Sequence, residues 1–367
     1  MSDSPLAIHT LHTLDPLTFP MSSPILVPAA HLQTFVSALF VHAGLPPSAA
    51  DTVAQALVWA ELRGIDTHGL SRVSFYLNFM HKGIIKTQPN FKVLQDTVAV
   101  QVLEADASAG AVAMQHACTQ AMDKARAVGL GLVMVRDTTH TGALGYFTQQ
   151  MARQGMVGMA FAASLPLMAY HGASAAGVST APLSIAVPAP HGEPMILDMA
   201  SGAVSMGQLK QAKIFNTPLV PGLALDAQGQ PTTDPQQATI PMPMSGPKGS
   251  GLALMFEMMA SLVMMNPIIA NYLSDQPGGR RHRQNAWVLA LDVARFCPLD
   301  QFILELERTV ASIKQLPTAD PEGALLMPGE RGQACYAQRL QDGIPMPMNL
   351  IIEFGELAHA RGVAVPW

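Results

Sequence analysis

The sequence predicts an α/β fold with a helical N-terminal lobe. Apolar residues recur at helical spacing through about the first 85 residues. After that point, runs rich in β-branched residues alternate with helical patterns, which is typical of a sheet covered by helices. No Gly-x-Gly-x-x-Gly motif occurs, so the fingerprint of an ordinary Rossmann fold is absent.

Three helices are predicted in the N-terminal lobe. Apolar residues at helical spacing mark the first two, at Leu32–Phe40 and Val53–Leu62. Ser48 and Asp51 resemble a capping box at the start of the second helix, and Gly64 ends it. The third helix is expected to begin with Asp66 or Thr67 as its N-cap and to run to about Lys82, where Gly83 stops it.

The rest of the chain is predicted to form the α/β body. Helices are expected at about residues 110–128 and 144–153, and Pro- and Gly-rich loops from Pro218 to Pro247. A buried Met-rich helix is expected at Gly249–Met264, a strand at Trp287–Asp292 and an amphipathic helix at Leu299–Lys314. The other expected strands are Phe91–Leu94, Val98–Leu103, Gly131–Val135, Gly155–Ala162, Leu183–Val187 and Met195–Leu197.

Composition narrows the class of protein. Of the 367 residues, 49% are hydrophobic and only 13% are charged, so we expect part of the apolar surface to be covered in an oligomer. The net charge is -5 and no long basic run occurs, which argues against nucleic acid or an anionic membrane as a partner. We expect a small-molecule substrate instead.

The cysteines and the N-terminus bear on the compartment. Cys118, Cys297 and Cys335 are odd in number and far apart, which favours a reducing compartment and gives no metal-ligand spacing. Residues 1–24 lack the pattern of a signal peptide and are interpreted as a loose extension. No apolar run reaches the ~20 residues of a membrane span. We therefore expect a cytoplasmic protein without a metal site.

The densest group of chemically capable residues is the motif Arg63-Gly-Ile-Asp-Thr-His68-Gly-Leu-Ser-Arg72. His68, Arg72 and Tyr76 recur every four residues, so we expect them to share one face of a helix. The arginine fork suits a substrate carboxylate, and a histidine near a helix N-terminus is biased toward its neutral form. The alternative is that Arg72 and Tyr76 form an ordinary solvated face and that His68 is a capping residue.

A second histidine lies in Asp137-Thr-Thr-His140-Thr-Gly142-Ala-Leu-Gly145-Tyr146, between a predicted strand and a helix. Ligands of open α/β sheets bind beyond the carboxyl ends of strands, so His140 is a candidate catalytic residue. The alternative is a loop histidine whose hydrogen bonds are all satisfied locally.

The third motif is the glycine-rich turn Ser245-Gly-Pro-Lys248-Gly-Ser-Gly251, which leads into an apolar helix. Backbone N–H groups at such a junction favour anions, and Lys248 adds a positive charge suited to a phosphate. The spacing is not that of a P-loop. These residues predict an anion site without identifying the ligand.

Taken together, the motifs resemble the malate/L-lactate dehydrogenase-like family, which includes ureidoglycolate, sulfolactate and malate dehydrogenases and piperideine/pyrroline-2-carboxylate reductases. The resemblance covers about Leu26 to Gly362, and the Phe147–Arg153 helix after His140 looks most like the ureidoglycolate dehydrogenase branch. Besides the three motifs above, the resemblance rests on Leu197-Asp-Met-Ala200, Asp226-Ala-Gln-Gly-Gln-Pro-Thr-Thr-Asp-Pro235 and Pro328-Gly-Glu-Arg331.

The resemblance implies a family-specific, non-Rossmann NAD(P)-binding fold, similar to L-sulfolactate dehydrogenase, in a homodimer. The expected organisation is an extension (1–24), a helical lobe with the substrate-side helix (25–85), a cofactor-binding body (86–325) and a C-terminal segment packing back on the lobe and the cofactor cleft (326–367). By resemblance, the catalytic residues are His140, His68, Arg72 and Thr67, and Arg72 and Tyr76 bind substrate. The residues expected to contact NAD or NADP are Ser164, Asp198, Met199, Ala200, Lys248, Gly329, Glu330 and Arg331.

The expected reaction is hydride transfer between nicotinamide and a small 2-hydroxy or 2-oxo carboxylate of the malate, lactate, ureidoglycolate or sulfolactate type. In it, His140 takes the hydroxyl proton and Arg72 holds the carboxylate. One alternative is a reductase of cyclic imino acids that uses the same pocket. A second alternative is a family member that only binds ligand, motivated by two departures from the family pattern, Ala181 and Gln208.

Two further features bear on the contacts. Thr67 replaces the serine usual in the family and keeps its hydroxyl. The cluster of Arg280, Arg281 and Arg283 could reach the 2'-phosphate of NADP, or it could belong to a mobile surface loop.

Overall fold

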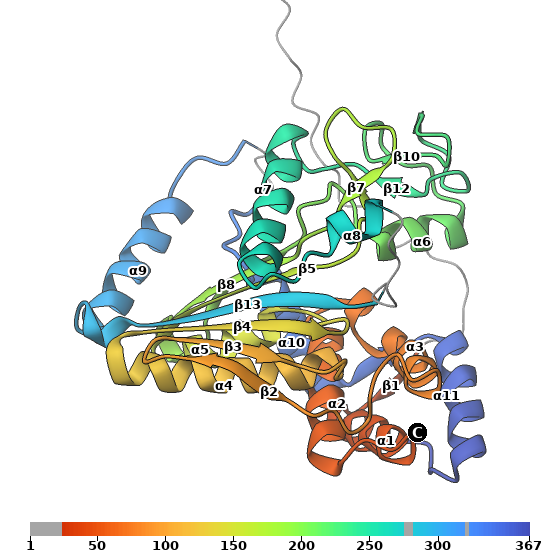
Figure 1. Cartoon of the computed structure of the whole chain (residues 1–367), viewed down its shortest axis with the longest axis horizontal. Coiled ribbons are helices and arrows are strands. Elements are labelled where there is room, and N and C mark those ends of the chain that lie inside the picture. Colours follow the sequence, from red (N-terminus) through yellow and green to blue (C-terminus); the bar gives the residue numbers. More distant parts are fainter. Residues whose placement is uncertain (1–23, 275–281, 320–322) are drawn as a thin grey trace, which may run out of the picture.

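A computed structural model describes residues 24–274, 282–319 and 323–367. Its centre is a seven-stranded sheet in the order β2-β3-β4-β13-β5-β8-β9 (Figure 1). Of the strand pairs in this sheet, only β3 and β4 run parallel. The strands are β2 (Lys92–Asp96), β3 (Val100–Glu104), β4 (Leu130–Thr138), β5 (Met156–Ala163), β8 (Leu183–Val187), β9 (Met195–Met199) and β13 (Gln284–Asp292).

The central strand β13 explains why the sheet is mixed. It comes late in the sequence and inserts antiparallel between β4 and β5, with Trp287 opposite Met134 on one side and Phe161 on the other. Its alternate residues Ala286, Val288 and Ala290 are fully buried. Such small and β-branched side chains leave room for the helices that pack on this face.

Helices cover both faces of the sheet. On one face lie α4 (Gly110–Val128), against β4 and β13, and α5 (Gly145–Arg153), against β5 and β8. On the other face α7 (Pro247–Glu257) packs against β5, where the ring of Phe161 stacks between Phe256 and Trp287. Figure 1 shows α4 and α5 below β13 and α7 above it.

The helical lobe combines both ends of the described chain. It contains α1 (Ala29–His42), α2 (Pro47–Leu62), α3 (Val73–His81), α10 (Glu330–Asp342) and α11 (Met348–Arg361). The strands β1 (Ile25–Val27) and β14 (Ile344–Met346) pair antiparallel beside them (Figure 1). Phe354 of α11 is fully buried against Phe35 of α1, with ring centroids 5.5 Å apart. One apolar core runs from this lobe to the sheet.

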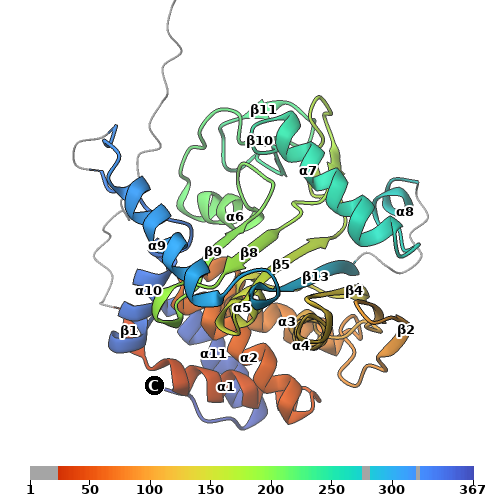
Figure 2. The same cartoon turned by 90° about the vertical axis from the view of Figure 1, so that its left-hand side faces the viewer.

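A third group of elements lies above the sheet, where Figure 2 shows α6, β10, β11 and α7 at the top and α1, α2 and α11 at the bottom. It contains mostly turns and short strands, as the Pro- and Gly-rich sequence predicts. Its elements are β6 (Met168–Ala169), β7 (Ala176–Val178), α6 (Met206–Phe215), β10 (Ala224–Leu225), β11 (Pro231–Thr232), β12 (Ile240–Pro241) and α8 (Ile269–Leu273). The helix α9 (Leu299–Lys314) follows the central strand β13 after a short 3-10 turn at Val293–Arg295 and lies at the left of Figure 1.

The predicted strands and helices of the α/β body are confirmed with end shifts of a few residues. Leu299–Lys314 is a helix as predicted, although none of its residues is buried. Among the described residues, no helix combines the length and the hydropathy that a membrane crossing requires. The expected loose extension lies almost wholly outside the described residues.

Two expectations about the N-terminal lobe are wrong. The helix predicted from Asp66 or Thr67 to Lys82 is interrupted: short 3-10 turns at Asp66–His68 and Leu70–Arg72 precede α3, and Gly69 between them is not helical. Ser48 and Asp51 do not cap α2, which begins one residue after Pro46 without a side-chain cap. Asp51 instead accepts a hydrogen bond from Ser37, 2.5 Å away, and so joins α2 to α1.

The prediction of a buried Met-rich helix at Gly249–Met264 is also wrong in part. The segment is helical, but it changes to π-helical geometry at Met258–Leu262. One side faces outward, where Met255 is 55% exposed and Val263 is 69% exposed. Hydrophobic composition therefore predicted the helix but not its burial, because much of the surface of a folded chain is itself apolar.

Candidate active site

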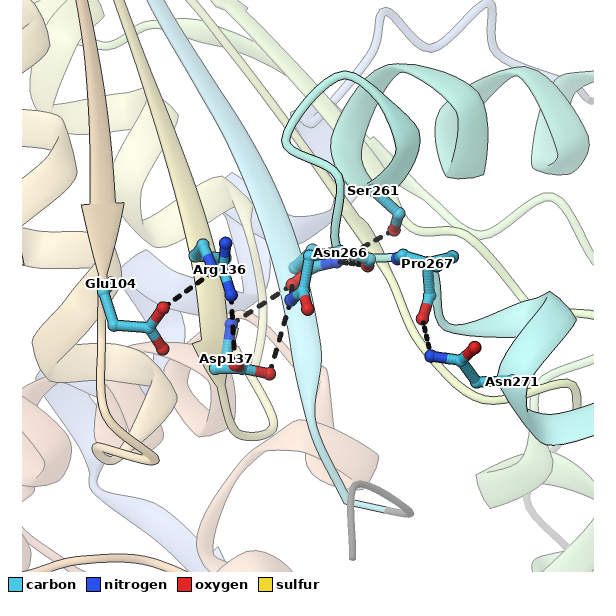
Figure 3. A network of polar contacts seen from close by, with 8 residues as sticks. Glu104, Arg136, Asp137, Ser261, Asn266, Pro267 and Asn271 are labelled. Carbon is cyan, nitrogen blue, oxygen red and sulfur yellow. Dashed lines mark hydrogen bonds and ion pairs between the residues drawn. The ribbon is translucent and has the colours of Figure 1, made fainter. Parts of the chain in front are cut away.

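The carboxyl end of β4 holds His140 in place. Asp137 has a left-handed backbone (φ 54°), and its N–H donates to the side-chain oxygen of buried Asn285 at 3.1 Å. Asn266 donates to the same oxygen at 2.9 Å and to Asp137 at 3.3 Å (Figure 3). A Cβ at Gly110 would lie 2.1 Å from the carbonyl oxygen of His140, so only glycine allows α4 to begin this close.

His140, Tyr76 and His68 form one cluster. The hydroxyl oxygen of Tyr76 lies 2.7 Å from Nδ1 of His140. The two imidazole rings stack with centroids 5.5 Å apart and an angle of 18° between their planes. Tyr76 is 5% exposed, so the alternative that it belongs to a solvated helix face is wrong. Residues 64 positions apart in the sequence thus meet at the β4 end.

Arg72 and Thr67 complete this cluster. Arg72 donates from Nε to the carbonyl oxygen of Thr67 at 2.6 Å, and its guanidinium lies over the ring of Phe75. The hydroxyl of Thr67 lies 3.0 Å from Nδ1 of His68. Since Arg72 uses Nε for the backbone, its two terminal nitrogens remain for a planar anion such as a carboxylate.

Burial and one positive charge set the protonation of this cluster. Desolvation, with a smaller contribution from the charge of Arg72, lowers the pKa of His68 to about 4. Desolvation, with smaller electrostatic contributions from His68 and Arg72, lowers the pKa of His140 well below its usual range. Burial raises the pKa of Tyr76. Near neutral pH the site therefore holds two neutral imidazoles, a protonated phenol and one cation.

Asp198, at the end of β9, lies beside the N-terminus of α5. Its Oδ2 accepts a hydrogen bond from the N–H of Gly145 at 2.8 Å, and a Cβ at Gly145 would lie 2.8 Å from the same oxygen. Burial raises the pKa of Asp198 to about 6, while the N–H of Gly145 and the charge of Arg63 act in the opposite direction. The β9 end is thereby attached to the helix that follows His140.

The segment from Asp198 to Gly207 contacts all three motifs found in the sequence. Beyond the bond between Asp198 and Gly145, a Cβ at Gly249 would lie 2.6 Å from the carbonyl oxygen of Ser201. A Cβ at Gly207 would lie 2.3 Å from the Thr67 side chain. Met199 and Ala200, both expected cofactor contacts, lie within this segment and are partly exposed. The segment is therefore the shared wall of the candidate site.

The Pro328–Arg331 turn lies against the same region. Gly329 (φ 87°) is the N-cap of α10, and its carbonyl accepts a hydrogen bond from Arg63 at 3.0 Å. The carbonyl of Pro328 accepts one from the N–H of Ile196 on β9 at 3.3 Å. Glu330 pairs with Lys314, and the hydrogen bonds from Lys314 and from the N–H of Met327 lower the pKa of this carboxyl. Arg331 is exposed.

Other expected cofactor contacts lie apart from the histidine cluster. Lys248 is exposed on the first turn of α7, after Gly246 with φ 59°. Ser164 follows β5 and donates to the adjacent carbonyl of Leu165 at 3.4 Å. Neither Lys248 nor Ser164 forms a hydrogen bond with His140 or His68 among the described residues.

The chemistry of these groups suits a dinucleotide. Lys248 and Arg331 are both exposed cations in the first turn of a helix, and a glycine with positive φ precedes each helix. N–H groups and positive charge at helix N-termini favour phosphates. Among the described residues, no group of three or more His, Cys, Asp or Glu side chains could hold a metal ion.

Of the two departures from the family pattern, Gln208 has a structural explanation and Ala181 has none. Gln208 forms a reciprocal capping box with Ser205 at the start of α6. Ala181 is fully buried with φ 34°. Of the arginine cluster, Arg283 donates to the carbonyl of Ile84 at 3.0 Å, whereas Arg280 and Arg281 lie outside the described residues.

Sequence reasoning missed several residues that support the site. Glu61, Asn266 and Asn285 are each at most 5% exposed and form hydrogen bonds beside the motifs. Glu61 had a signal in the sequence, since it is the one acidic residue in the mostly apolar Val53–Leu62. The two asparagines had no comparable signal, because their partners are far away in the sequence.

Comparison with known proteins identifies relatives over nearly the whole chain. The family model for malate/L-lactate dehydrogenase matches residues 27–354. The NAD(+)-dependent ureidoglycolate dehydrogenase of Escherichia coli K12 is 30% identical over 82% of this chain and 86% of its own. The NADP(+)-dependent (2R)-3-sulfolactate dehydrogenase of Chromohalobacter salexigens is 30% identical over 90% of this chain and 97% of its own.

Solved structures agree with this result. The sulfolactate dehydrogenase from Methanocaldococcus jannaschii superposes with a TM-score of 0.83 and 26% identity, covering 93% of this chain and 98% of that one. The Δ1-piperideine-2-carboxylate reductase from Pseudomonas syringae superposes with a TM-score of 0.81 and 25% identity, covering 91% of this chain and 100% of that one. The predicted resemblance and fold are confirmed.

The low pKa of His68 predicts how stability depends on pH. Its pKa is about 4 in the folded protein and near 6.5 when unfolded, so the unfolded chain binds more protons between these values. The contribution of neutral His68 to the free energy of unfolding should therefore be lost as the pH falls from about 6.5 to about 4. Urea denaturation at several pH values gives the free energy of unfolding of the wild type and of His68→Asn. The difference between the two curves of this free energy against pH measures the contribution of His68. His31→Asn, at an exposed position, is the control, and parallel curves for wild type and His68→Asn would contradict the prediction.

Proposed function

Because this chain belongs to the malate/L-lactate dehydrogenase family, we propose that it transfers a hydride between NAD or NADP and a small 2-hydroxy or 2-oxo carboxylate. The observation that carries the proposal is the 2.7 Å contact between Tyr76 and His140 in a cluster that also contains His68 and Arg72. This arrangement offers a neutral proton acceptor beside a cation for the carboxylate.

Arg72 and the histidines have distinct roles in this proposal. The terminal nitrogens of Arg72 bind the substrate carboxylate and orient the carbon that reacts. Nε2 of His140 accepts the hydroxyl proton, which requires Nδ1 to carry a hydrogen and to donate it to the oxygen of Tyr76. Thr67 fixes the ring of His68, which stacks on His140 and excludes water from one of its faces.

When bound, the nicotinamide would supply the redox chemistry of the reaction, as hydride acceptor in oxidation and hydride donor in reduction. In the reductive direction, the imidazolium of His140 returns its proton to the substrate oxygen or nitrogen. Its low pKa favours this release. Lys248, Arg331 and the turn at Gly329 would hold the phosphates of the cofactor, and Ser164 and the Asp198–Ala200 segment would line its site.

A cyclic imino acid reductase is the second candidate, because the likeness to the piperideine-2-carboxylate reductase covers 91% of this chain. Both reactions need a carboxylate anchor and a proton donor, so the same residues serve either one. Steady-state rates with NADH or NADPH on piperideine-2-carboxylate, pyrroline-2-carboxylate and open-chain 2-oxo acids separate the two. A ligand-binding protein without catalysis would bind nucleotide and turn over neither class.

We propose a cytoplasmic homodimer as the working form. Three free cysteines suit a reducing compartment. Exposed apolar residues after α7, Val263 at 69% and Met265 at 85%, are suited to cover by a second copy. Sedimentation equilibrium that gives the mass of one chain would contradict the dimer.

Replacing His140 tests the proton transfer. His140→Ala should lower kcat by a factor of about 10²–10⁴ and leave the dissociation constant of NADH nearly unchanged, because only the proton acceptor is removed. His116→Ala, on α4 and against Phe91, is the control with normal kcat. Near-normal turnover by His140→Ala would remove this residue from the mechanism.

Replacing Arg72 tests the carboxylate anchor. Arg72→Ala should lower kcat/KM by about 10²-fold, mostly through KM, because charge-assisted hydrogen bonds to the carboxylate are lost. Arg72→Lys should recover only part of this loss, since an ammonium lacks the planar fork. Substrate kinetics equal to the wild type in Arg72→Ala would refute this role.

A further inference from the structure

The last turn of α2 carries a buried acid, Glu61, that faces the turn between His68 and Arg72. Its Oε2 accepts a hydrogen bond from the N–H of Leu70 at 2.8 Å. Glu61 is 5% exposed and Leu70 is fully buried. A Cβ at Gly69 would lie 1.9 Å from the same oxygen. The carboxyl thus occupies the place where a side chain at position 69 would stand.

This contact explains why the chain is not a continuous helix here. Gly69 has φ -94° and ψ -139°, outside the helical region, between two short 3-10 turns. The N–H of Leu70 bonds to Glu61 instead of to a carbonyl within a helix. Without an oxygen at this position, the N–H would be a buried donor without a partner, which is unfavourable.

Arg339 of α10 contacts both Glu61 and Asp66. Its Nη1 donates to Asp66 at 2.9 Å and to the carbonyl oxygen of Glu61, and lies 4.0 Å from Oε1 of Glu61. Burial, reinforced by the charge of Asp66, raises the pKa of Glu61 to about 8, against the N–H of Leu70 and the charge of Arg339. Both protonation states leave an oxygen that accepts the Leu70 N–H.

We propose that Glu61 is a positioning residue: by accepting the Leu70 N–H it sets the turn that presents His68 and Arg72 to His140. The inference rests on the proposed function, because the catalytic value of the turn depends on those three residues. Arg72 is bonded across the same turn to the carbonyl of Thr67 at 2.6 Å. A shift of Leu70 therefore moves both the imidazole and the carboxylate anchor.

A core-filling role for Glu61 makes a different prediction. Burying a carboxyl is unfavourable unless its oxygens are hydrogen-bonded, so an apolar side chain would fill the same space at lower cost. Under the positioning role, the acceptor oxygen matters and the charge does not. Glu61→Gln keeps an acceptor oxygen of similar reach, whereas Glu61→Ala removes it.

The test combines kinetics with hydrogen exchange on the full chain. We expect Glu61→Ala to lower kcat/KM by about 100-fold, as a misplacement near 1 Å does, with the dissociation constant of NADH unchanged within about threefold. Glu61→Gln should stay within about threefold of the wild type. Amide exchange of the peptide covering residues 65–73, measured by mass spectrometry, should rise in Glu61→Ala and not in Glu61→Gln.

Gly69→Ala tests the same contact from the other side and serves if Glu61→Ala fails to fold. Alone, it should lower kcat/KM about as much as Glu61→Ala, whereas in the Glu61→Ala background it should add little, because the clash is gone. Asp226→Ala is the matched control, since that carboxylate also accepts backbone N–H bonds, from Gln228 and Gln230, in a turn near β10.

Two results would overturn the proposal: normal kcat/KM and normal exchange in Glu61→Ala, or equal losses in Glu61→Ala and Glu61→Gln. The exchange measurement needs no substrate. If the wild type turns over no substrate, the proposed function fails, while the exchange of residues 65–73 still decides whether Glu61 holds the turn.

Discussion

The last turn of α2 is the constraint on which the site depends. Two side chains of this turn, Trp59 and Glu61, and the C-cap residue Arg63 reach three separate parts of the chain. Trp59 donates to Gln149 of α5 at 3.2 Å, and Glu61 accepts from Leu70. Arg63 stacks on Trp59 and donates to Gly329 and to Gln333, each at 3.0 Å. Because these groups are buried, each bond lost would leave a polar atom without water or partner, so the segments keep one arrangement.

The same burial sets the chemistry. Two imidazoles and one guanidinium share a poorly hydrated space, so the charged forms of the histidines are disfavoured and their pKa values fall. The cation remains, since arginine does not lose its proton in proteins. A carboxylate that enters this space neutralises the charge of Arg72 and thereby makes a proton on His140 less unfavourable. Substrate binding and proton transfer are coupled through electrostatics in this account.

The sequence predicted the elements of the sheet well, because periodicity of apolar residues reports burial along one strand or helix. It predicted His140 at a strand end for the same reason. It did not predict the break at Gly69, since the cause is a side chain on another helix, nor the insertion of β13 between β4 and β5. The contact of Tyr76 with His140 likewise depends on how the lobe docks on the sheet. Tertiary contacts of this kind leave no local pattern in the sequence.

The central claim is that the histidine cluster and the Asp198–Gly207 segment surround one reaction site. The most direct measurement is a crystal structure of the protein with NADH and oxamate, a non-reacting analogue of a 2-oxo acid. The account predicts the oxamate carboxylate on the terminal nitrogens of Arg72, its carbonyl oxygen within hydrogen-bond distance of Nε2 of His140, and the nicotinamide against the Asp198–Ala200 segment. Oxamate or nicotinamide bound away from His140 would contradict it.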